Sequence, residues 1–217
     1  MKTTHTDITV VLDRSGSMAS VQDDTIGGFN RFLEDQRKAP GSASITLHQF
    51  DTVFETLIKA QDVHAAPLLS TTTFVPRGST ALLDAIGRSI GDTGSRMEST
   101  PEADRAAKVV FVIITDGYEN ASHEYNQAKV FEMIKHQQDK YSWEFVFLGA
   151  NQDAIKTAAG IGVHAGNSMT YASNTAGVAA AFASTSSNIR SFRAGGQSVR
   201  YSEADRDAQK KAGATTK

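Results

Sequence analysis

The sequence predicts an α/β protein: an open, mostly parallel sheet with one antiparallel edge strand and helices on both faces. Short apolar runs rich in β-branched and aromatic residues, at 8–12, 109–114 and 143–148, are typical of strands buried on both faces. Amphipathic stretches with helical spacing lie between such runs, and this alternation indicates a layered α/β sheet. Only 43–59 departs from it, because its two strand-like runs are separated by two residues and predict an edge hairpin.

The remaining elements follow from periodicity and capping residues. A weak strand is expected near 169–171, and helices are expected at about 19–38, 80–91, 126–140, 151–159 and 174–192. Asn151 is interpreted as the cap of the fourth helix, and Phe131 as a core residue by its spacing. The polar stretch 91–108 is interpreted as a surface loop.

Length and composition predict one soluble domain. The 217 residues suit a single core, assigned to 1–192, followed by a polar tail at 193–217 in which Ser202 and Asp205 can start a short helix. A net charge of −2 argues against a nucleic-acid or anionic-membrane partner. The chain has no cysteine, no apolar run of membrane-spanning length and no signal-peptide pattern, so a cytoplasmic protein is expected.

Oxygen-bearing side chains follow the strongest predicted strands. Asp13 ends the 8–12 strand, Asp116 follows the 109–114 strand, and both carboxylates face one crevice if the strands are neighbours. A third polar loop, RGST, brings Thr80 to the start of a helix. The five candidate metal ligands are Asp13, Ser15, Ser17, Thr80 and Asp116. They are hard donors, which favour Mg²⁺, with Mn²⁺ or Ca²⁺ as alternatives. Singly, each is also explained by turn or capping chemistry.

These residues carry a family resemblance. DRSGS at 13–17, Thr80 in GST and Asp116 in TDG resemble the three loops, in chain order, of the metal-ion-dependent adhesion site of von Willebrand factor A (vWA) domains. The resemblance implies a Rossmann-like vWA fold over about 5–190 and the same five residues as metal ligands. It also implies a partner protein that supplies an Asp or Glu carboxylate to the metal, and a last body helix that shifts on binding. GYENASHEYN and FLGANQDA resemble stand-alone bacterial and phage vWA proteins.

The expected function is therefore a non-enzymatic, Mg²⁺-dependent protein-binding module. One alternative is a structural or assembly component of a phage particle or other complex. Another is a Mg²⁺-dependent hydrolase, but Ser15 stands where haloacid-dehalogenase-type phosphatases place their second aspartate, and no GxSxG motif is present. Six further residues of the same loops are interpreted either as a partner-selecting rim or as solvated positions: Arg14, Arg77, Tyr118, Glu119, Asn120 and His123.

Overall fold

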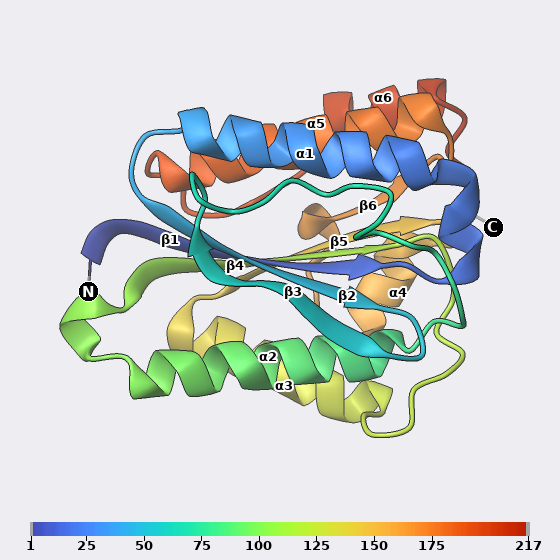
Figure 1. The fold of residues 1–217 in the computed structure, drawn as a ribbon. Helices are drawn as coiled ribbons and strands as arrows, with labels where there is room; N and C mark the ends of the chain where they lie inside the picture. Colours follow the sequence, from blue (N-terminus) through green and yellow to red (C-terminus); the bar gives the residue numbers. More distant parts are fainter. Residues whose placement is uncertain (1, 216–217) are drawn as a thin grey trace.

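One six-stranded sheet organises the chain, in the order β3-β2-β1-β4-β5-β6 (Figure 1). The computed structural model describes residues 2–215, with side chains from His5 onward. The strands are β1 (Lys2–Asp13), β2 (Ala43–Phe50), β3 (Phe54–Asp62), β4 (Ala106–Thr115), β5 (Glu144–Ala150) and β6 (Ser168–Tyr171). All neighbouring pairs are parallel except β2 and β3. The predicted α/β sheet with an antiparallel edge hairpin is confirmed.

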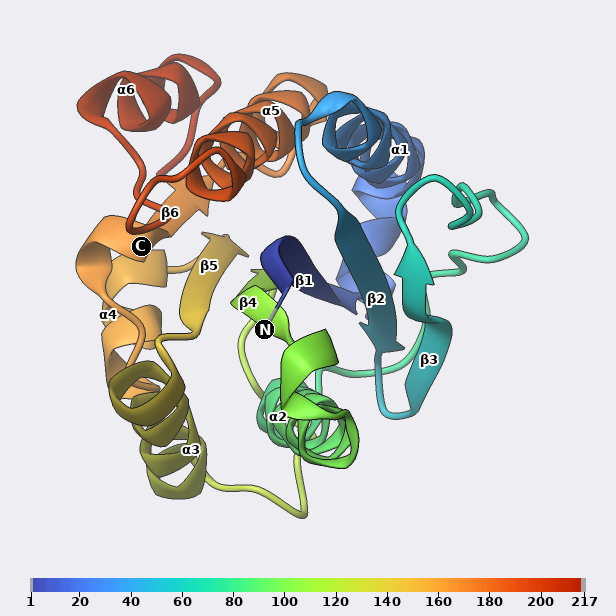
Figure 2. The same ribbon diagram turned by 90° about the vertical axis from the view of Figure 1, so that its left-hand side faces the viewer.

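Helices cover both faces of the sheet (Figure 2). One face carries α1 (Gln22–Lys38), α5 (Thr175–Arg193) and α6 (Glu203–Lys211), and the other carries α2 (Leu82–Ser99), α3 (Gln127–Tyr141) and α4 (Ala154–Gly160). Short 3-10 turns lie at Gly16–Val21, Glu102–Asp104 and Ala165–Asn167. The first of these turns leads from β1 into α1; it contains Ser17, and Ser15 directly precedes it.

Alternating side chains of the central strands divide the core into two layers. Ile8, Val10 and Leu12 of β1 pack under α1 and α5, whereas Val11 packs under α2. β4 alternates in the same way, with Val112 in the first layer. Because side chains on a strand point to opposite faces in turn, an unbroken apolar run fills both layers. The short 8–12 and 109–114 runs predicted this two-sided burial.

The predicted loop at 91–108 is wrong over its first half, because α2 continues to Ser99. Thr93 is buried against β1, and the guanidinium of Arg96 contacts both carboxylate oxygens of Asp7 at 2.8 and 3.0 Å. Gly91 and Gly94 lower the intrinsic helix propensity of this part of α2, and the contacts of Thr93 and Arg96 with β1 support the helix despite them.

Two further details differ from expectation. Asp153, not Asn151, caps α4, and Asn151 instead has a left-handed φ of 56° and turns its amide toward the end of β4. Asparagine tolerates this backbone conformation better than most residues. Phe131 is 40% exposed on α3, so its assignment to the core is wrong.

The segment after α5 packs back on the domain. Val199 and Tyr201 lie in the core layer beneath α5, and the Tyr201 hydroxyl is 2.7 Å from Thr185 Oγ1. Ser202 and Asp205 form a capping box that starts α6, as their spacing predicted. Residues 216–217 of the predicted tail lie outside the described residues.

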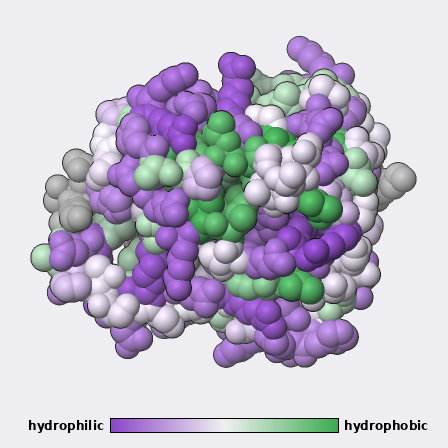
Figure 3. Space-filling view, in the orientation of Figure 1, coloured by the Kyte–Doolittle hydropathy of each residue, from purple (hydrophilic) through white to green (hydrophobic). Residues whose placement is uncertain are grey.

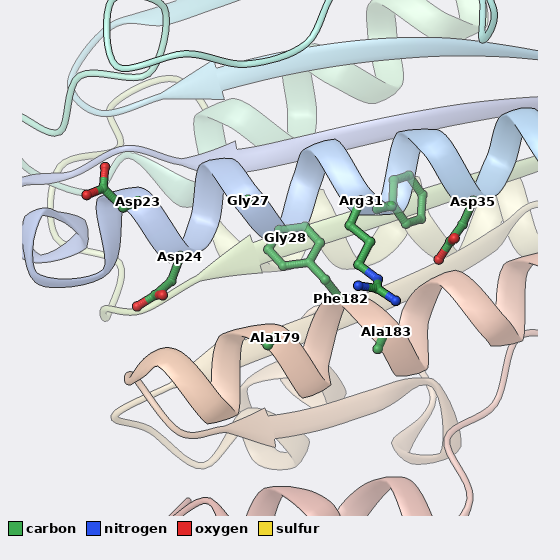
Figure 4. A pocket seen from close by; sticks show the side chains of 10 residues that line it. Asp23, Asp24, Gly27, Gly28, Arg31, Asp35, Ala179, Phe182 and Ala183 are labelled. Atoms are coloured by element: carbon green, nitrogen blue, oxygen red, sulfur yellow. The ribbon is translucent and has the colours of Figure 1, made fainter.

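The contact between α1 and α5 depends on a glycine. The ring of Phe182 projects from α5 against Gly28 of α1, beside a shallow cavity (Figure 4). A Cβ placed on Gly28 would lie 2.3 Å from the Phe182 ring, whereas a Cβ on the neighbouring Gly27 would meet nothing within 4 Å. Substitutions at Gly28 and Gly27 therefore test the packing against Phe182 and the intrinsic helix propensity of glycine separately.

We expect Gly28→Ala to destabilise the protein by about 1 to 3 kcal/mol, because the buried Phe182 ring must leave its rotamer or push the helices apart. Gly27→Ala is the matched control and should stabilise by about 0.5 to 1 kcal/mol, since alanine favours helix at an open position. Urea unfolding of both variants measures the difference, and equal stabilities would contradict this account of the interface.

Candidate metal centre

The register of the sheet brings the first and third predicted loops together. Leu12 pairs with Ile114, so Asp13 and Thr115 end neighbouring parallel strands at the same edge. The Thr115 hydroxyl donates a 2.6 Å hydrogen bond to Asp13 Oδ2, and the Ser15 N–H donates one of 2.6 Å to Asp13 Oδ1. The position and orientation of the Asp13 carboxylate are thus set by both strands.

The two serines of the first loop connect Asp13 to Asp116. Ser15 Oγ and Ser17 Oγ lie 3.1 Å apart, and the Ser17 hydroxyl donates to Asp116 Oδ1 at 2.5 Å. Asp13, Ser15 and Asp116 are buried, whereas Ser17 is exposed at the mouth. Four of the five candidate ligands therefore form one network that opens to solvent at Ser17.

The second loop places Thr80 beside this network. The Thr80 N–H donates to Asn120 Oδ1 at 2.9 Å, and the Asn120 N–H donates to the Thr80 carbonyl at 3.0 Å. A Cβ on Gly117 would lie 3.5 Å from Thr80 Oγ1 and 3.7 Å from Ser17 Oγ, so these two hydroxyls flank one position. The structure brings all five predicted residues to one end of the sheet.

Burial dominates the electrostatics of this centre. Desolvation raises the pKa of Asp13 to about 6, against the opposing hydrogen bonds from Thr115 and Ser15, and it also raises the pKa of Asp116. The two carboxylates in turn help burial to raise the pKa of the enclosed Tyr171 hydroxyl. Within the described part of the chain, no cationic side chain pairs with Asp13 or Asp116.

The nearest arginine in sequence is directed elsewhere. Arg14 is buried, and its guanidinium contacts Asp51 at 2.9 Å and Glu55 at 2.6 Å. Arg77 of the second loop contacts the same two carboxylates at 3.0 and 3.3 Å. Burial opposes ionisation of Asp51, but the Val53 N–H and the two guanidinium groups lower its pKa below the ordinary value. The arginines thus join the first two loops without neutralising Asp13.

Two carboxylates fasten the third loop to α2. Asp84 accepts backbone N–H groups of His123, Glu124 and Tyr125 at 2.8 to 2.9 Å. Those three bonds overcome the effect of burial and lower the Asp84 pKa. Glu119 binds in the opposite sense, accepting the Leu83 N–H at 2.8 Å. The loop after β4 is therefore rigidly placed over the centre.

The donor set fits a hard divalent cation. Hydroxyl and carboxylate oxygens are the ligands of Mg²⁺, Mn²⁺ and Ca²⁺, and two buried carboxylates without a counter-charge favour a cation between them. Among the residues that the structure describes, no group of three His, Cys, Asp or Glu side chains forms another metal site. The centre is instead unusual in being rich in hydroxyls.

The additional loop residues divide by role. Arg14, Glu119 and Asn120 are structural, because their side chains hold loops together, and Tyr118 is 57% exposed at the rim. Sequence reasoning missed Asp51 and Asp84 as loop-fastening residues. Their one available signal was position: Asp51 directly follows a strand, and Asp84 lies in the first turn of a helix, where an acid is favoured.

Comparisons with solved structures support the fold. Proximal thread matrix protein 1 from the mussel byssus, in a form with a zinc-occupied MIDAS motif, matches with a TM-score of 0.57 at 15% identity over 86% of this chain and 46% of that one. The pilus adhesin SpaC of Lactobacillus rhamnosus GG matches at 0.62, with 16% identity over 85% and 30%. A von Willebrand factor type A protein from Catenulispora acidiphila matches at 0.55, with 14% identity over 86% and 42%.

These likenesses show a vWA-type fold, and the chain spans less than half the length of each of these proteins. No family model and no curated protein sequence matches the chain. Within the described residues, no helix is long and apolar enough to cross a membrane.

The raised pKa of Asp13 predicts a specific pH dependence. In the metal-free protein, the neutral form of Asp13 is favoured by folding, so its contribution to stability is present below the unfolded pKa and is lost as pH rises through about 6. Relative to Asp13→Asn, the parent should lose about 2 to 3 kcal/mol of unfolding free energy between pH 4 and pH 7. Urea unfolding of both proteins across this pH range measures the difference. If the two stability–pH curves run parallel, the pKa of Asp13 is not raised by folding and the prediction is wrong.

Asp84→Ala tests the fastening of the third loop. Three backbone N–H groups lose a charged acceptor, so we expect a loss of about 2 to 4 kcal/mol in urea unfolding. Asp92→Ala, an exposed carboxylate on the same helix, should change stability by less than about 0.5 kcal/mol. A similar effect of both variants would mean that the Asp84 contacts add little.

Proposed function

We propose that this chain is a non-enzymatic, divalent-metal-dependent protein-binding module. In this proposal Asp13, Ser15, Ser17 and Thr80 hold Mg²⁺, with Asp116 binding directly or through water. The observation that carries it is the pair of buried carboxylates, Asp13 and Asp116, which are linked through Ser15 and Ser17 and have no cationic partner among the described residues. A bound cation removes the cost of ionising them at neutral pH.

The ligand chemistry also supports a partner that brings a carboxylate. Hydroxyl ligands carry no formal charge, so a cation held by three of them and two carboxylates keeps affinity for a further anion. An Asp or Glu side chain of a partner protein supplies that anion. The mussel matrix protein, whose MIDAS motif is described as zinc-occupied, is consistent with a divalent metal at this place in the fold. Mn²⁺ and Ca²⁺ suit the same oxygen donors.

Exposed side chains around the centre suit a protein partner. Tyr118 follows Asp116 closely in the chain, and Val53 and Arg77 both flank Asp51. Apolar surface continues over the face that carries β3 and the loop after it (Figure 3). Two of its exposed residues are Leu57 and Leu68. A partner that buries aliphatic surface while presenting an acidic residue fits this combination. The proposal includes a cytoplasmic location, which a chain without cysteine suits.

The proposal predicts that Asp13→Ala abolishes metal binding and partner binding but leaves the protein folded, because it removes a ligand whose burial is itself unfavourable. Isothermal titration with Mg²⁺ measures the first effect. Affinity capture from a host lysate, in Mg²⁺ and in EDTA, measures the second. Asp92→Ala is the control for the loss of an acidic side chain, since Asp92 is exposed on α2 and is not one of the candidate ligands.

A protein captured by the parent and by Asp92→Ala, but only in Mg²⁺ and not by Asp13→Ala, would establish the binding module. Equal capture by every bait in both buffers would favour an assembly component instead. Unchanged Mg²⁺ affinity in Asp13→Ala would show that the metal site is assigned wrongly, and metal-dependent hydrolysis of a phosphate ester would favour an enzyme.

A further inference from the structure

A second polar cavity lies between the edge hairpin and the C-terminal half of α2. Its volume is about 440 Å³, and no candidate metal ligand lines it. β2 and β3 contribute Thr46, His48, Thr56 and Lys59. The α2 side contributes Asp92, Thr93, Ser95, Arg96 and Ser99. The lining is thus made of hydroxyl, imidazole and charged groups.

His48 lines this cavity, and one of its ring nitrogens is buried without a partner among the described residues. Only 2% of the His48 surface is exposed, and Nε2 has no hydrogen-bond partner within the described part of the chain. Nδ1 lies 3.0 Å from Thr56 Oγ1. When the Thr56 hydroxyl donates to Nδ1, the proton of the neutral ring is on Nε2, and a buried N–H then lacks an acceptor. Leaving such a donor unpaired is costly, so an acceptor in the cavity is favoured.

The backbone beside His48 is irregular. Ile45 pairs with Gln61 and Leu47 with Ile58, so Lys59 and Ala60 together face the single residue Thr46 in a β-bulge. Ala60 has a φ of 46°, and its N–H is bound by Thr46 Oγ1 at 3.1 Å. Alanine rarely takes this conformation, and bulges and strained residues concentrate at functional sites.

Two cationic side chains lie near the imidazole, Arg96 and Lys59. Lys59 forms no ion pair among the described residues, and Arg96, although paired with Asp7, also lines the cavity. Burial is the main cause that lowers the pKa of His48 to about 4, and the positive charges of Arg96 and Lys59 contribute to the same shift. Asp92 also lines the cavity and contributes the opposing charge.

We propose that this cavity binds a phosphate-type oxyanion between Lys59, Arg96 and the Nε2–H of His48. Serine and threonine hydroxyls of α2 and the hairpin complete its donors. Lys59 and Arg96 bring positively charged N–H donors to the lining, which are the strong hydrogen-bond donors for an oxyanion. The site is independent of the metal centre and does not rest on the proposed function. Free phosphate and a phosphomonoester share this chemistry.

The test is a titration of the metal-free protein with inorganic phosphate, followed by NMR of the histidine ring nitrogens. His48→Gln identifies the His48 signals. We expect Nε2 to carry the proton and its signal to shift saturably. Lys59→Gln should weaken binding by about fivefold or more, and Asp92→Asn should tighten it, because the first removes an attracting charge and the second a repelling one.

Lys156→Gln is the matched control, since it removes one exposed positive charge far from the cavity lining and should leave the affinity unchanged. O-phosphoserine as a second ligand shows whether the site takes a phosphomonoester or only the free anion. Unmoved His48 signals at tens of millimolar phosphate would overturn the proposal. Equal weakening by Lys59→Gln and Lys156→Gln would also overturn it, because the attraction would then be general.

Discussion

The candidate metal centre depends on the burial of one carboxylate, Asp13, at the point where two central parallel strands end together. β1 and β4 pair as parallel neighbours between the two core layers, and their register leaves Asp13 beside Thr115 with none of its surface exposed. Burial of a charge without a counter-ion is unfavourable. A cation bound at this position would offset the cost of ionising the buried Asp13 carboxylate. The core therefore supplies the electrostatic reason for a cation at this edge.

Other carboxylates prepare that position without filling it. Asp84 and Glu119 are satisfied by backbone N–H groups, and Asp51 by the Val53 N–H and two arginines, so each fastens a loop. Each of these carboxylates interacts with donors in direct contact with it. Asp13 and Asp116 accept only hydroxyl or single backbone donors, which leaves lone pairs available. The division into fastening and available carboxylates is set by hydrogen-bond partners rather than by residue type.

Much of this architecture is predictable because local signals agree with the tertiary structure. The apolar runs that end at Asp13 and before Asp116 identify the two central strands. Because these residues follow the runs, they also indicate the edge of the sheet at which the candidate site forms. The C-terminal half of α2 was not predictable, since its glycines argue against helix and its support comes from Asp7, far away in the chain. Likewise, asparagine is a residue type that often caps helices, and only the contact of Asn151 with the Asp116 carbonyl shows that it has another role here.

Arg14 shows why placement, and not motif membership, determines the charge of the centre. It stands between Asp13 and Ser15 in sequence, and a guanidinium turned toward Asp13 would neutralise that carboxylate in place of a metal. Arg14 directly follows the end of β1, and its N–H donates to the carbonyl of Phe50 at the end of β2 at 2.8 Å, which places Arg14 beside the edge hairpin. There Asp51 and Glu55 bind it, so the cost of burying its charge is offset at the hairpin. The hairpin thus supports the candidate metal centre although it contributes no candidate ligand.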